Sequence, residues 1–190
     1  MRADGSLRDM SCNATEGSAI PALPLSAAQQ ETWLAYMRVT LRLTYEMNHQ
    51  LQRDSDLTLA DYDVLNALAD SPGGRLQLTA LATRIGWERS RVSHHTRRMG
   101  ARGLVERGPS PTDRRATDAV LTDAGRAALV AATPGHAALV RRMFFDGLDR
   151  DLVGSLRTAL DQVHEQVLLT GTLPRPGPPQ HRLPGLDRTD

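Results

Sequence analysis

The chain has 190 residues, of which 40% are hydrophobic and only 4% aromatic, and its formal net charge is +1. This length allows one domain or a small lobe with a helical extension, and the shortage of aromatic side chains favours packed helices over a β-sandwich. Cys12 is the single cysteine, so an intramolecular disulfide is excluded, and no apolar run reaches membrane-spanning length. We therefore expect a mainly helical, cytoplasmic protein.

The first half of the chain is predicted to alternate helices with short breaks. Residues 1–24 are small and polar and predict a flexible arm. Ser26 and Gln29 have the spacing of a capping box and open a first helix that runs to about Arg53. Thr58 opens a second helix, and the Ser-Pro-Gly-Gly sequence at 71–74 ends it.

The middle of the chain predicts two helices inside a small antiparallel sheet. An edge strand at 75–77 is followed by helices at 78–85 and from about Trp87 to Ala101. Residues 104–107 then alternate as a strand, which Gly108 to Pro111 should break. A returning strand at 117–121 completes a hairpin with a long tip.

Two further helices follow the hairpin. Thr122 should cap the first of them, and Pro134 with Gly135 should kink or interrupt it. An amphipathic helix follows from Asp149, and Gly171 and several prolines then begin a disordered tail.

Positive charge is concentrated in the segment from Arg84 to Arg115. It contains nine arginines and three acidic residues, a local net charge of +6 in a chain that is almost neutral. Such a concentration indicates a surface that binds a polyanion.

The helix at 87–101 divides into two faces on a helical wheel. Val92, Thr96 and Met99 form an apolar side that should pack against the preceding helix, as in a helix-turn-helix. The opposite side carries hydrogen-bonding groups suited to base edges and phosphates, with two arginines at its edge. This predicted recognition surface comprises Ser90, Arg91, Ser93, His94, Arg97 and Arg98.

Together these motifs resemble the MarR family of bacterial winged helix-turn-helix regulators. The resemblance rests on Leu81-Ala82, Gly86, Ser90-Arg91-Val92-Ser93, Gly103-Leu104-Val105-Glu106-Arg107, Asp113-Arg114-Arg115 and Leu121-Thr122-Asp123-Ala124-Gly125.

The resemblance implies a homodimer that binds double-stranded DNA at a pseudo-palindromic operator. It also implies that Asp113 braces Arg115 at the tip of the wing, with Arg114 between them near a phosphate or the minor groove. Relatives of this kind usually repress a neighbouring gene and release DNA when a small aromatic or phenolic ligand binds.

Apolar residues of the terminal helices support the dimer independently. They offer more apolar surface than a small winged lobe can cover, and self-association would bury it. The predicted dimerisation residues are Trp33, Met37, Leu41, Val140, Phe144, Leu156, Leu160, Val163 and Val167. The predicted organisation is an arm (1–24), a dimerisation helix (25–54), a winged helix-turn-helix lobe (55–121), C-terminal dimerisation helices (122–171) and a tail (172–190).

Other functions have weaker support. Tyr45, His49 and Tyr62 are the residues we would place nearest an effector, although ordinary boundary positions with hydroxyls in water explain the two tyrosines better. A winged-helix module that binds protein, or a redox-responsive regulator that uses Cys12, are the alternatives. No phosphate loop, metal-ligand triad or nucleophile elbow is present in the sequence, so we expect no enzyme, no cofactor and no metal.

Overall fold

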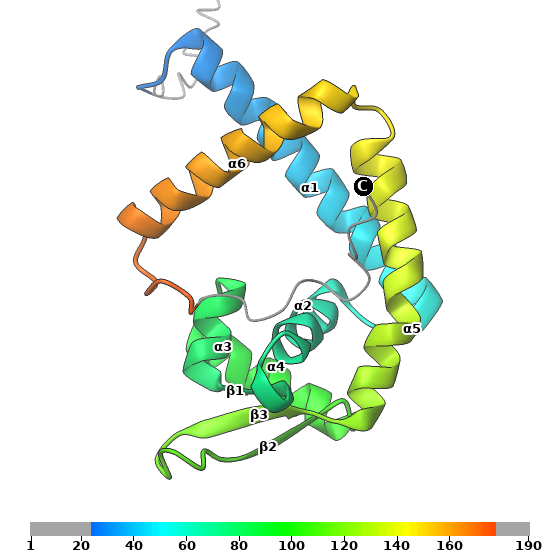
Figure 1. Cartoon of the computed structure of the whole chain (residues 1–190), viewed down its shortest axis with the longest axis vertical. Coiled ribbons are helices and arrows are strands. Elements are labelled where there is room, and N and C mark those ends of the chain that lie inside the picture. Colours follow the sequence, from blue (N-terminus) through cyan, green and yellow to red (C-terminus); the bar gives the residue numbers. More distant parts are fainter. Residues whose placement is uncertain (1–23, 178–190) are drawn as a thin grey trace, which may run out of the picture. The chain divides into compact units, whose positions relative to one another are not determined.

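A computed structural model describes residues 24–177 of the chain (Figure 1). Cys12 and the predicted arm up to residue 23 lie outside the described residues, as does the predicted tail from residue 178. The chain divides into two compact units, Met1–Val39 and Thr40–Asp190. None of the helices within 24–177 is long and apolar enough to cross a lipid bilayer.

Helix α1 (Ala27–Ser55) begins in the first unit with the predicted capping box. The backbone N–H of Ser26 donates to Gln29 Oε1 at 2.8 Å, and the Gln29 N–H donates to Ser26 Oγ at 3.3 Å. Two otherwise unpaired donors at the start of the helix are thus satisfied by one pair of side chains.

The second unit contains the remaining elements, and its mainly helical fold with a small hairpin agrees with the prediction (Figure 1). In chain order these elements are α2 (Leu59–Ala69), the short helix η1 (Pro72–Gly74), β1 (Arg75–Gln77), α3 (Leu78–Ile85), α4 (Arg89–Ala101), β2 (Val105–Pro109), β3 (Thr117–Leu121), α5 (Asp123–Val140), the π-helical turn η2 (Arg141–Phe145) and α6 (Arg150–Thr170).

The three strands form one antiparallel sheet in the order β1-β3-β2. β1 is an edge strand, as predicted. The prediction that Gly108 and Pro109 end the second strand is wrong, because Pro109 still pairs with Thr117. β2 is the other outer strand, where one row of N–H groups has no partner strand and proline is therefore tolerated.

The core of this unit lies between α2, α3, α4 and the sheet. Leu65, Leu81, Val92, Met99 and Val105 are among its fully buried side chains. Burial of the apolar side of α4 is what orients the opposite side of that helix outward.

Local signals set the ends of the helices in this core. Thr58 and Asp61 form a reciprocal capping box at the start of α2. Gly86 ends α3 with φ 70°, a left-handed conformation that favours glycine. α4 starts at Arg89 with Glu88 as its N-cap, two residues after the predicted Trp87.

Helix α5 begins against the sheet and continues through its proline. The Thr122 side chain accepts from the Gly125 N–H at 2.9 Å and so caps the helix as predicted. The predicted interruption at Pro134 is wrong, since α5 runs unbroken to Val140 and the irregular turn follows at Arg141–Phe145.

Helix α6 has no buried residue. Leu152, Leu160, Val163 and Val167 are among its exposed apolar side chains, with 51%, 44%, 60% and 57% of their surface accessible. No element within residues 24–177 covers this apolar surface.

We predict that Gly125→Ala destabilises the second unit by about 1–3 kcal/mol, because overpacking a tight site forces a backbone shift. A Cβ at Gly125 would lie 2.0 Å from the Leu104 carbonyl oxygen. Urea unfolding followed by circular dichroism measures the change. Gly100→Ala is the control, since its Cβ would lie 3.5 Å from the nearest atom and the helix gains propensity. Equal stabilities of the two variants would contradict the prediction.

Candidate nucleic-acid interface

Helix α4 presents the two faces that its sequence predicts. Val92, Thr96 and Met99 are buried, whereas His94 and Arg97 are exposed. His95 is also buried on this apolar side. The outward face therefore carries a dense set of hydrogen-bond donors on a helix that its core contacts hold firmly.

The loop of the β2–β3 hairpin forms the predicted wing, with Asp113, Arg114 and Arg115 all exposed. Asp113 Oδ1 accepts a hydrogen bond from the backbone N–H of Arg115 at 2.9 Å. The expected brace thus acts on the main chain of Arg115 and leaves its guanidinium group available. The backbone N–H of Ser110 closes the loop by donating to the Ala116 carbonyl at 3.0 Å.

Arg107 links the wing to helix α4, a contact that the sequence analysis missed. It lies on β2 and donates through its Nη2 to Ser93 Oγ at 3.3 Å. Ser93, predicted to contact a base, is therefore already bonded to the sheet. The alternation of residues 104–107 predicts that Arg107 lies on one face of a strand, but it does not predict that Arg107 contacts Ser93.

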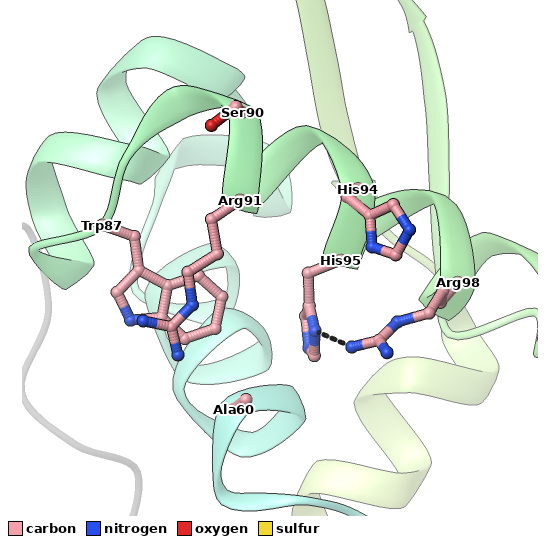
Figure 2. A pocket seen from close by; sticks show the side chains of 7 residues that line it. All are labelled: Ala60, Trp87, Ser90, Arg91, His94, His95 and Arg98. Carbon is pink, nitrogen blue, oxygen red and sulfur yellow. Dashed lines mark hydrogen bonds between the residues drawn. The ribbon is translucent and has the colours of Figure 1, made fainter.

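The flank of α4 next to α2 holds a pocket of about 420 Å³. Figure 2 shows Arg91, His95 and Arg98 directed toward this flank. The lining residues are Ala60, Trp87, Ser90, Arg91, His94, His95 and Arg98.

Two of the predicted recognition arginines are held by aromatic rings on this flank. The Arg91 guanidinium carbon lies 3.9 Å from the centre of the Trp87 ring, a cation–π contact. Arg98 Nη2 lies 2.8 Å from His95 Nδ1. Trp87 also meets His95 edge to face, with 5.3 Å between ring centres. The sequence placed both arginines at the edge of the recognition surface but did not predict these contacts.

Asp61 is the charged centre beneath this flank. Its buried carboxylate accepts from Arg102 Nη1 at 2.8 Å and from the backbone N–H of Thr58 at 3.0 Å. His95 Nε2 lies 2.9 Å from Asp61 Oδ1, although outside the angular range of a good hydrogen bond. Burial alone would raise the pKa of Asp61, but the contacts with His95, Thr58 and Arg102 outweigh it and hold this pKa below its usual range.

The three residues predicted near an effector divide into two places. Tyr45 and His49 stack on each other on α1, with 6.1 Å between ring centres, and both are exposed. Tyr62 is buried on α2 and packs on His136 of α5 at 4.5 Å. Burial lowers the pKa of His136. The effector role of Tyr45, His49 and Tyr62 stays a prediction.

The sequence predicts no metal site, and side chains that could bind a metal ion are scattered along it. Within residues 24–177, no three His, Cys, Asp or Glu side chains gather as a metal ion would require.

A helix-turn-helix followed by a hairpin with an arginine-bearing loop defines a winged helix-turn-helix protein. A family model described as the MarR family matches residues 55–116. Transcriptional regulator HosA of Escherichia coli O111:H- is 32% identical over 113 residues, which cover 60% of this chain and 73% of that protein.

Solved structures agree with this assignment. The chain is 36% identical to Sco3205, a MarR family regulator of Streptomyces coelicolor whose crystal structure is a complex with DNA, with a TM-score of 0.74 over 80% of this chain and 98% of that one. It is 34% identical to AbsC of the same organism, with a TM-score of 0.71 over 77% of this chain and 98% of that one. The chain belongs to the MarR family and is a transcriptional regulator, as the resemblance implied, and not an enzyme.

We predict that Asp61→Asn lowers the free energy of unfolding at pH 7 by about 1–3 kcal/mol, because the amide lacks the negative charge that pairs with Arg102 and replaces one acceptor oxygen by a donor. The pKa of Asp61 is lower in the folded chain than the unfolded value near 4, so its stabilisation is complete above that value and is lost as the pH falls below it. Urea titrations between pH 5 and pH 3 should therefore show a shallower loss of stability for Asp61→Asn than for the original chain.

Asp63→Asn is the matched control on the same helix. Burial raises the pKa of Asp63, so protonation of this carboxyl at low pH favours the folded state. Its removal should steepen the loss of stability in acid. The prediction for Asp61 fails if both variants follow the pH dependence of the original chain.

Proposed function

We propose that this MarR family regulator binds double-stranded DNA as a homodimer, with α4 in the major groove and the 110–116 loop at the adjacent minor groove. One observation carries the proposal: the Arg107–Ser93 hydrogen bond joins the wing to α4, so that their exposed donors belong to one rigid surface. Sco3205, at 36% identity, was solved in complex with DNA, which supports DNA binding by this chain.

The donors on this surface are suited to different parts of DNA. His94 and Arg97 are exposed on α4 and match acceptors on base edges in the major groove. Arg114 and Arg115 on the wing match the negative potential of a narrow minor groove or the phosphates beside it. Ser90 is also exposed on α4, and its hydroxyl offers a further base contact.

The dimer is proposed from uncovered apolar surface. α6 is an amphipathic helix of 21 residues without a buried side chain, and on α1 Trp33 and Leu41 have 49% and 66% of their surface exposed. A second copy offers the same apolar surface, and a two-fold dimer buries the apolar surface of both copies at once. Two lobes related in this way match a palindromic operator.

We further propose that the dimer represses transcription and that a small aromatic ligand releases it from DNA. A dimer bound at an operator that overlaps a promoter would occlude the polymerase. The stacked Tyr45–His49 pair, with Tyr45 61% exposed, offers an aromatic surface on α1 to which such a ligand can pack.

Arg115→Ala should weaken operator binding at least about tenfold, because a charged contact to DNA contributes roughly 1.5–3 kcal/mol. The variant should keep its thermal unfolding midpoint, since Arg115 is exposed. Mobility-shift titrations on the DNA upstream of its own gene measure the affinity at several salt concentrations. Arg150→Ala removes an exposed arginine from the start of α6 and is the control. Equal affinities of the two variants would show that the wing does not touch DNA, and no sequence-selective, salt-sensitive binding by the unaltered chain would sink the proposed function.

Val163→Asp should convert the dimer to monomers, because a carboxylate cannot be buried there without a partner. Light scattering coupled to gel filtration reports the mass. Gln162→Asp places the same charge on the neighbouring residue of α6 and should leave the dimer intact. A monomeric original chain, or a dimer in both variants, would rule out an interface at this face of α6.

A further inference from the structure

His95 occupies a buried position between two charged side chains that come from different parts of the fold. Asp61 of α2 lies on one side of the ring, 2.9 Å from Nε2. Arg98 lies on the other side, 2.8 Å from Nδ1, as the dashed line in Figure 2 marks. Only 7% of the His95 side chain is exposed, and Trp87 closes its remaining edge.

The chemistry of these two neighbours determines which ring nitrogen carries the proton. An arginine guanidinium group has only donors and keeps its proton at any ordinary pH. Nδ1 of His95 must therefore accept the hydrogen bond from Arg98, which places the single proton of the neutral ring on Nε2. Nε2 lies 2.9 Å from Asp61 Oδ1 but outside the angular range of a good hydrogen bond, so the negative charge of Asp61 acts on the ring electrostatically and makes Nδ1 a better acceptor.

A second proton on His95 is incompatible with this arrangement. It would place an N–H at Nδ1 against the donors of Arg98, with two positive charges at hydrogen-bond distance. Asp61 would stabilise the cationic ring from the other side. Arg98 would consequently leave the flank, and it belongs to an exposed arginine-rich face that ends one turn later.

We propose that His95 is a positioning residue for Arg98: as a neutral ring it holds Arg98 on the α2 flank, and as a cation it releases Arg98 to contact a DNA phosphate. This inference rests on the DNA-binding function proposed above and adds to it a dependence of affinity on pH. Affinity should rise as the pH falls, because the released guanidinium group adds one phosphate contact.

The other charged groups around the ring do not replace this role. Asp63 of α2 interacts with Arg91, which Trp87 holds. Arg102 is bonded to Asp61, and Arg107 of β2 to Ser93. On α3, Arg84 bonds to Ser71 and to carbonyl groups at the end of α2. His94 is exposed at the neighbouring position and is common to every variant compared below.

The test measures operator affinity at pH 7.5 and pH 5.5 for the full-length chain and its variants. The original chain should bind about tenfold more tightly at pH 5.5, as one added charged contact implies, and its salt slope should steepen by about one. His95→Gln keeps a neutral donor and acceptor but cannot gain the charge, so it should lose this increment. Arg98→Ala should lose the same increment, and the double variant should lose no more than either single variant.

Arg97→Ala is the matched control, because it removes the neighbouring arginine without touching His95. It should weaken binding equally at both pH values and keep the pH-dependent increment. If Arg98→Ala also keeps that increment, the inference is overturned, and this comparison remains decisive even if His95→Gln fails to fold. Absence of binding at both pH values would instead be a failure of the proposed function.

A second measurement is independent of DNA. Long-range ¹⁵N–¹H correlation spectra of the free protein at pH 7.5 should show His95 as the neutral ring with its proton on Nε2. A neutral ring with its proton on Nδ1, or a cationic ring at this pH, would overturn the inference.

Discussion

The buried carboxylate of Asp61 is the interaction on which the arrangement of the DNA-reading half depends. It caps α2 through Thr58, receives Arg102 from beyond the end of α4, and faces His95 in the middle of that helix. A buried carboxylate is costly unless such contacts offset its desolvation. α2 and α4 therefore cannot separate without leaving a charge unpaired, and electrostatics fixes the orientation of α4 in addition to the apolar core.

The same geometry divides the arginines that the sequence presents as one basic cluster. Arg102 and Arg107 are used inside the lobe, and Arg91 and Arg98 are held by Trp87 and His95. Within the described residues the side chains of Arg97, Arg114 and Arg115 have no such partner. The positive charge that is available to contact DNA is thus smaller than the local net charge. The charges of Arg91 and Arg98 become available only when their contacts with Trp87 and His95 break.

Sequence reasoning succeeded where a structure depends on neighbouring residues and failed where it depends on distant ones. Thr58, Gly86 and Thr122 mark helix ends because their own side chain or backbone conformation satisfies nearby groups. Pro109 broke no element because it lies on an outer strand, where a missing N–H is tolerated, and α5 continues through Pro134 at an exposed position. The recognition face followed from periodicity, but the pairing of Asp61 with Arg102, 41 residues apart, had no local signal.

The stability of the winged lobe and the stability of the proposed dimer depend on different contacts. The buried core of the winged lobe is built from α2, α3, α4 and the sheet together with Leu51 of α1 and Leu129 and Ala132 of α5, and it contains no residue of α6. α6 has no buried side chain within residues 24–177, and in the proposed dimer its burial would come from the second copy. In the proposed dimer, loss of the interface would therefore lower operator affinity by separating two intact winged lobes. Damage at Asp61 would instead disorder each winged lobe itself.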